Sequence, residues 1–110
     1  QNFEEDIEKN GYAIMALEPV HTGGATRLSA FLLINKGIPK KQVKSIIKKA
    51  NEDIKTKQSY SNEIQEARHK GKIADVVWLY IFNEVVTEGT YRLLIFIVIT
   101  YAERSGLAQN

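Results

Sequence analysis

The C-terminal third of the chain is the feature that most constrains its fold. Two runs rich in β-branched and aromatic residues, Ile73 to Val86 and Tyr91 to Arg104, flank the short polar segment Thr87-Glu88-Gly89-Thr90. Such runs on either side of a glycine-containing turn predict a long antiparallel hairpin. Any fold of this chain therefore has to place two long strands next to each other.

Both faces of this predicted hairpin are apolar. A sheet with water on one side alternates apolar and polar residues. We therefore expect both faces of this hairpin to be covered by other parts of the protein or by a partner. If the strands pair in the simplest register, one face carries Trp78, Tyr80, Phe82, Phe96 and Val98. We predict that this face is an interface with a second copy or another protein. The alternative interpretation is that short helices elsewhere in the chain complete an ordinary core over it.

The residues before the hairpin predict one strand and four helices. The pattern indicates helices over residues 2–10, 25–36, 39–57 and 61–71, and a strand over residues 12–17. The two central helices are separated by Gly37, and Pro39 suits the first turn of the second. The predicted fold is α+β: a three-stranded, mainly antiparallel sheet with a long C-terminal hairpin and the two central helices packed on it.

Length and composition exclude several classes of protein. A chain of 110 residues, 44% apolar and 25% charged, fits one domain spanning residues 1–110. Its start at Gln1 suggests excision from a longer chain. The longest apolar run, Leu93 to Ile99, is shorter than the roughly 20 residues of a membrane span, so no membrane contact is predicted. The absence of cysteine excludes disulfides and thiolate zinc sites, and the acidic start favours a cytoplasmic location.

Lysines follow one flank of the helix predicted over residues 39–57. At 100° per residue, its apolar positions lie within about 60° of Val43, whereas four lysines lie between about 100° and 160° from it. Residues 36–57 hold eight lysines against two acidic residues, a net charge of +6. The predicted nucleic-acid-binding residues are Lys40, Lys41, Gln42, Lys44, Lys48 and Lys55. The lysines would attract phosphates, and only Gln42 suits base reading. The alternative is that this flank is an ordinary solvated helix surface.

The segment Leu33 to Ile46 resembles the helix-turn-helix pattern. Gly37 matches the turn glycine, and Val43 and Ile46 match inward positions of a recognition helix, although Leu33 stands where a small residue is usual. Together with the final hairpin, the chain is also similar to a winged helix. That resemblance, an alternative to the three-stranded sheet, implies that residues 39–45 enter a DNA major groove.

The loop between the first strand and the next predicted helix is a candidate anion site. Two glycines, hydroxyl groups and an arginine near a helix N-terminus suit a phosphate or carboxylate. The residues concerned are Thr22, Gly23, Gly24, Thr26 and Arg27. The alternative is that the glycines only turn the chain and a threonine caps the helix.

An enzymatic function has less to support it. Carboxylates near predicted strand ends, at Glu18, Asp75 and Glu84, resemble those of a metal-dependent nuclease, and Lys72 is close by. No Glu-X-Lys triplet accompanies them, so a nuclease fragment is the third interpretation. No catalytic residue, metal or cofactor is predicted. The sequence favours a non-enzymatic nucleic-acid-binding domain within an oligomeric assembly, and the alternative is a protein-interaction or oligomerisation domain that uses the apolar hairpin face.

Overall fold

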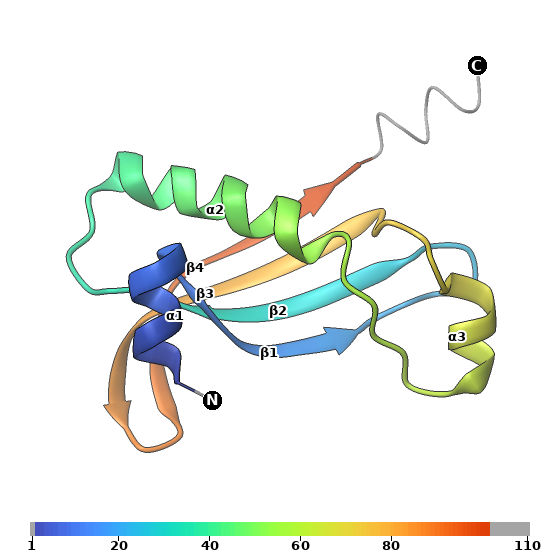
Figure 1. Ribbon diagram of the computed structural model, residues 1–110, viewed down its shortest axis with the longest axis horizontal. Coiled ribbons are helices and arrows are strands. Elements are labelled where there is room, and N and C mark those ends of the chain that lie inside the picture. Colours follow the sequence, from blue (N-terminus) through green and yellow to red (C-terminus); the bar gives the residue numbers. More distant parts are fainter. Residues whose placement is uncertain (1, 102–110) are drawn as a thin grey trace.

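The computed structural model describes residues 2–101 and shows a mixed α+β fold. Its elements are α1 (Phe3–Asn10), β1 (Ala13–Pro19), β2 (Arg27–Leu33), α2 (Lys40–Ile54), α3 (Glu63–His69), β3 (Val76–Thr87) and β4 (Thr90–Thr100). The four strands form one sheet in the order β1-β2-β3-β4 (Figure 1). The outer pairs are antiparallel, and β2 and β3 are parallel. The α+β class and the C-terminal hairpin are confirmed; residues 102–104 of the predicted last strand lie outside the described residues.

The prediction of a helix over residues 25–36 is wrong, because this segment forms β2. Leu28, Ala30 and Leu32 point to the core, while Phe31 points to the other face of the sheet. An inner strand that is apolar on both sides has no alternation, and its spacing of leucines also fits a helix. Its pairing partner β3 lies more than 40 residues further along the chain, out of reach of any local pattern.

A local signal for β2 was nevertheless present in the two glycines before it. The backbone groups of Thr22 and Ala25 exchange hydrogen bonds of 3.1 and 3.3 Å across Gly23 and Gly24. This is a two-residue hairpin turn, for which a Gly-Gly pair is a recognised signature. The glycines therefore connect β1 to β2 and do not lead into a helix.

Four consequences follow for the predicted fold. The sheet has four strands and not three, because β2 was taken for a helix. Only one central helix, α2, packs on the sheet, so the predicted pair of central helices is wrong. Without a helix before Gly37, the helix-turn-helix pattern and the winged-helix alternative are wrong as well. The connection from β2 through α2 and α3 to β3 is instead a crossover between parallel strands.

An asparagine side chain caps the N-terminus of each short helix. The Asn2 side chain accepts a hydrogen bond from the Glu5 N–H, and Gly11 ends α1 in the left-handed conformation at φ 90°. The Asn62 side chain accepts likewise from the Gln65 N–H at the start of α3. Both helices are therefore set by their own sequences.

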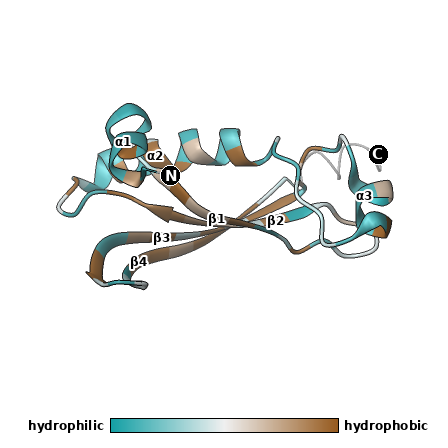
Figure 2. Cartoon of the chain, turned by 60° about the horizontal axis from the view of Figure 1, so that its bottom comes forward, coloured by the Kyte–Doolittle hydropathy of each residue, from teal (hydrophilic) through white to brown (hydrophobic). Residues whose placement is uncertain are grey.

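The core lies between α2 and one face of the sheet. The fully buried helix residues Ala50 and Ile54 contribute to one cluster with Ala30 of β2 and Leu79 of β3. The apolar positions predicted for this helix are the ones that face the sheet, as the colouring in Figure 2 shows. No helix among residues 2–101 has the length and hydrophobicity needed to cross a membrane.

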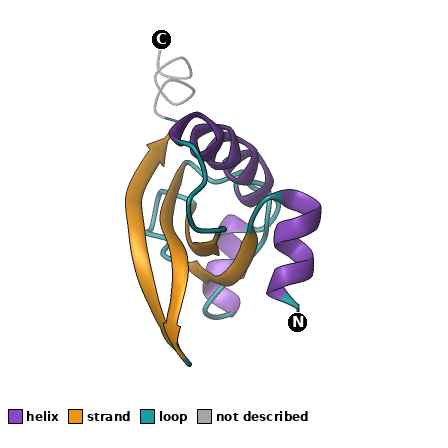
Figure 3. Ribbon diagram, turned by 90° about the vertical axis from the view of Figure 1, so that its left-hand side faces the viewer, coloured by secondary structure: helices purple, strands orange, loops and turns teal. Residues whose placement is uncertain are grey.

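The other face of the sheet carries no helix in the described part of the chain. In Figure 3, α1 and α2 lie on one side of the strands, and the opposite side is open. Figure 2 shows α3 beyond one end of the sheet. The short helices therefore do not complete a second core layer.

Candidate functional site

The uncovered sheet face collects aromatic residues from the three strands β2, β3 and β4. Trp78 pairs with Val98 and Tyr80 with Phe96, which places the five residues predicted as an interface on one side of the hairpin. Phe31 pairs with Tyr80 from the other side and extends this surface. We call this surface the open face: Phe31, Trp78, Tyr80, Phe82, Phe96 and Val98. Phe31 was missed because its segment was predicted as a helix.

The rings of the open face contact one another and remain accessible to solvent. Tyr80 stacks on Phe96 with ring centroids 4.5 Å apart, and Phe31 lies 4.9 Å from Tyr80. Phe31, Phe96 and Val98 keep 37, 44 and 48% of their surface exposed. The result is one contiguous apolar patch, of the kind that marks a partner surface in soluble proteins.

Arg27 lies at the border of the open face. Its guanidinium carbon lies 4.9 Å from the centroid of the Trp78 ring, within the range of a cation–π contact. Its Nε is buried and has no hydrogen-bond partner among residues 2–101. Arg27, predicted as an anion ligand, is therefore held by an aromatic ring.

The predicted nucleic-acid-binding residues lie on α2 or, in the case of Lys55, directly after it, away from the open face. Lys40, Lys41, Lys44 and Lys48 are exposed, and their side chains form no hydrogen bond or ion pair with other described residues. Lys55 differs, because its Nζ lies 2.9 Å from a Glu52 carboxylate oxygen. Since α2 covers the opposite side of the sheet, the lysines and the open face cannot contact the same small ligand.

A polar cluster at the end of the sheet near α3 involves both histidines. His21 and His69 stack with ring centroids 4.2 Å apart, although 48 positions separate them in the chain. The His21 Nδ1 accepts a hydrogen bond from the Arg27 N–H, so its other nitrogen, 2.8 Å from the Ser59 carbonyl oxygen, carries the proton. The His69 Nδ1 is hydrogen-bonded to the Thr26 hydroxyl at 2.9 Å. These bonds fasten the segment around α3 to the β1–β2 turn.

Burial of the His69 ring lowers its pKa, and the nearby His21, Lys72 and Arg68 lower it further. A hydrogen bond to the Thr22 backbone acts in the opposite direction. The folded protein therefore binds a proton at this site less readily than the unfolded chain.

The free energy of unfolding is expected to fall as the pH drops below the ordinary histidine pKa of about 6.5. Below that pH the unfolded chain binds a proton at His69, whereas the folded protein does not yet bind one. The free energy of unfolding stops falling once the pH is below the lowered pKa of His69 in the folded protein. Urea unfolding between about pH 7.5 and 5.5 measures this dependence. A His69→Gln variant should show a smaller dependence, and an equal dependence in both proteins contradicts the explanation.

The predicted anion loop uses four of its backbone donors in internal hydrogen bonds. The N–H groups of Thr22 and Ala25 bond within the turn, that of Thr26 donates to an Asp75 carboxylate oxygen at 3.0 Å, and that of Arg27 donates to His21. The helix N-terminus on which this prediction rested does not exist. The N–H groups of Thr22, Ala25, Thr26 and Arg27 are therefore engaged within the protein, and anion binding at this loop stays a prediction.

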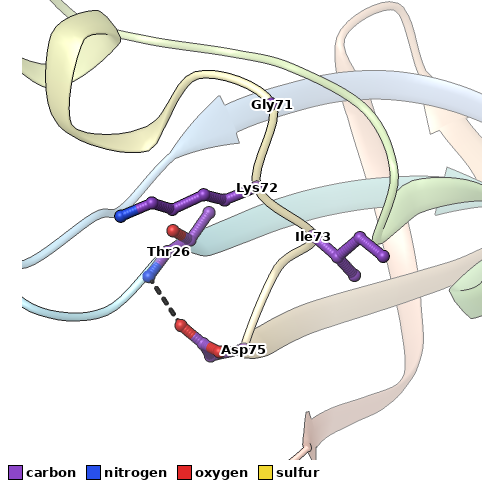
Figure 4. A pocket seen from close by; sticks show the side chains of 5 residues that line it. All are labelled: Thr26, Gly71, Lys72, Ile73 and Asp75. Carbon is purple, nitrogen blue, oxygen red and sulfur yellow. Dashed lines mark hydrogen bonds between the residues drawn. The ribbon is translucent and has the colours of Figure 1, made fainter.

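The pocket beside this loop is lined by Thr26, Gly71, Lys72, Ile73 and Asp75 (Figure 4). The Lys72 side chain lies next to Thr26, and the Asp75 carboxylate accepts the Thr26 N–H. Glu84 is nine residues further along the chain, about 30 Å in extended conformation, and contacts Lys36 and Arg92. The structure thus separates Glu84 from Asp75, two of the three carboxylates predicted for a nuclease. Within residues 2–101, no group of three or more His, Asp or Glu side chains could hold a metal ion.

Comparisons with protein-family models, curated proteins and solved structures find no match to this chain.

Proposed function

We propose that this chain is a non-enzymatic protein-interaction domain that associates with a second copy of itself through the open face. The observation that carries the proposal is the row of contacting aromatic residues on a sheet face that no described helix covers. Covering such a face removes apolar surface from water, and each Å² of apolar surface that is buried stabilises the assembly by about 25 cal/mol. Two copies packed face to face would provide the missing layer.

The composition of the open face supports association with protein. The cores of protein interfaces are enriched in aromatic residues and depleted in charged ones. In the register of the sheet, Glu18 and Arg27 share the side of Trp78, and both lie at its border. The centre of the face, around Tyr80 and Phe96, holds only apolar and aromatic side chains. A sheet face packed on a second sheet has this pattern.

Sedimentation of the unmodified chain, together with fluorescence quenching, tests the proposal. Trp78 is the only tryptophan, so its emission reports on the open face directly. We expect a dimer at roughly 10–100 µM and a decrease of quencher access to Trp78 as the protein concentration rises. A protein that remains monomeric across this range contradicts self-association.

Nucleic-acid binding through α2 is the second candidate function. It is favoured by the four exposed lysines without acidic partners in the described chain and by the net charge of +6 over residues 36–57. Lys40 and Lys48 are about 12 Å apart along the helix, enough to follow several phosphates. Because the lysines face away from the open face, a dimer formed there would leave them accessible.

Replacing Lys41, Lys44 and Lys48 by glutamine is expected to weaken nucleic-acid binding and its salt dependence together. Each lost phosphate contact should reduce the slope of log affinity against log salt by roughly 0.9 for duplex DNA. Lys49→Gln is the matched control, because Lys49 lies on the other flank, where its Nζ donates to the Asn10 carbonyl oxygen. Absence of binding to DNA or RNA at about 50 mM salt rules out this function.

A further inference from the structure

We propose that the free edge of β4, together with the adjoining lysine flank of α2, binds an extended acidic polypeptide segment that adds to the sheet as a fifth strand. This site is separate from the open face and does not depend on the function proposed above. Three features carry the inference: an unprotected strand edge, a helix flank aligned with it, and the spacing of the charges on that flank.

The edge of β4 lacks the usual protection of an outer strand. β4 is last in the sheet order, so one of its edges has no partner strand among the described residues. Outer strands are commonly protected by lysine, proline or inward charges. The sequence of β4, TYRLLIFIVIT, has only one charged residue, Arg92, and its Nε already donates to Glu84. From Ile95 to Thr100 the pairing with β3 runs without a register shift, so this edge offers a regular row of backbone donors and acceptors.

One flank of α2 lies along the edge side of β4. Near the start of α2 and the middle of β4, Val43 and Ile95 help to line an apolar groove together with Ile38, Lys40 and Leu94. Near their ends, the Asn51 amide donates to the Tyr101 hydroxyl, and the Lys55 Nζ lies 4.9 Å from the centroid of the Tyr101 ring. The same side of the helix therefore lies beside β4 near the start of α2 and beside Tyr101, the residue after β4, near the end of α2.

Three lysines without acidic partners among the described residues belong to this flank. Measured around the helix from Val43, Asn51 lies at about 80° and Lys40, Lys44 and Lys48 lie between about 60° and 140°. The opposite flank faces α1 and β1, where Asp53 accepts from the Tyr12 hydroxyl. A strand added at β4 would run below the lysine flank.

The spacing of these lysines matches that of a strand. Lys40, Lys44 and Lys48 follow each other every four residues, which is about 6 Å along a helix. Side chains on one face of a strand recur about every 6.6 Å. A segment with acidic residues at alternate positions would therefore place a carboxylate near each lysine in turn. An apolar side chain at one end would enter the groove beside Ile38 and Val43.

Charge also argues against the other occupants of this edge. An antiparallel pair of β4 strands from two copies would put both α2 helices on the same face, with their lysine flanks facing each other, and like charges at an interface are unfavourable. A nucleic acid could neutralise the lysines, but it would leave the backbone groups of β4 without partners. An extended acidic segment would neutralise the lysines and also pair with the backbone groups of β4, as in other cases of strand addition.

The test measures binding of a fluorescein-labelled twelve-residue peptide of alternating valine and glutamate by anisotropy. Its controls are the same peptide N-methylated at alternate residues, a shuffled peptide of the same composition, and a single-stranded oligonucleotide of equal charge. N-methylation removes the strand-pairing donors and leaves the charge unchanged. We expect the first peptide to bind more tightly than each of the three controls, and its binding to weaken with added salt.

Lys44→Gln with Lys48→Gln should weaken this binding by roughly tenfold, since each exposed ion pair contributes modestly. Lys49→Gln, which removes one positive charge on the other flank of α2, should leave it unaltered. Equal binding of the N-methylated peptide would show that the strand edge takes no part, and tighter binding of the oligonucleotide would assign the lysines to nucleic acid. Either result, or no binding at all, overturns the proposal. None of these results bears on self-association through the open face.

Discussion

Replacing Phe96 by lysine is expected to convert the self-associated protein to a monomer that remains folded. Phe96 lies at the centre of the open face, stacked on Tyr80 and edge-on to Trp78 with ring centroids 6.5 Å apart. In a monomer the lysine ammonium reaches water, because the position is 44% exposed. In a dimer the same charge would be buried without a partner. Central aromatic residues of interfaces typically contribute 2 kcal/mol or more, so the dissociation constant should rise by a factor of about 30 or more.

Sedimentation measures the change in association, and circular dichroism with urea unfolding verifies the fold. Ile64→Lys is the matched control, since Ile64 is 66% exposed on α3 at the end of the sheet and away from the open face. Val98→Lys, on the same face as Phe96, should reproduce the effect. If both open-face variants associate as strongly as the unmodified chain, the open face is not the contact surface.

Replacing Leu79 by alanine is expected to lower the free energy of unfolding by about 2–5 kcal/mol. Leu79 has no exposed surface and pairs with Ala30 on one side and Ile97 on the other. Its side chain fills the space under α2, where removal of three carbons leaves a cavity that a rigid sheet cannot close. Against a typical total of 5–15 kcal/mol, this is a large part of the stability of a domain with one covered face.

Urea unfolding measures this loss, with Val98→Ala as control. Val98 lies on the neighbouring strand but on the open face, where 48% of its surface is exposed. In a monomeric sample, Val98→Ala should therefore lower the free energy of unfolding much less than Leu79→Ala does. A loss from Leu79→Ala no larger than that from Val98→Ala would mean that the main core is not between α2 and the sheet.

Elements whose signals are local could be predicted from the amino-acid sequence alone. The turn at Glu88-Gly89 and the runs around it specify the hairpin, and capping by Asn2 and Asn62 specifies two short helices. The amphipathic pattern around Val43 placed the inner face of α2 correctly. The sequence also indicated that Trp78 and Phe96 share a face, since alternation along two directly connected strands is a local property.

The way in which distant segments meet depends on the packing of the folded domain. Arg27–Leu33 became a strand because it pairs with β1 and β3 on both sides, an environment that outweighs its helical spacing of leucines. The stacking of His21 on His69 arises because α3 folds back onto the β1–β2 turn, which no spacing in the chain encodes. In the same way, the lysines are recognisable as one flank of a helix from sequence. Their position beside the free edge of β4 follows only from the crossover that lays α2 along the sheet. Contacts between residues far apart in the chain depend on the packing of the whole domain, so these features appear only once the sheet is assembled.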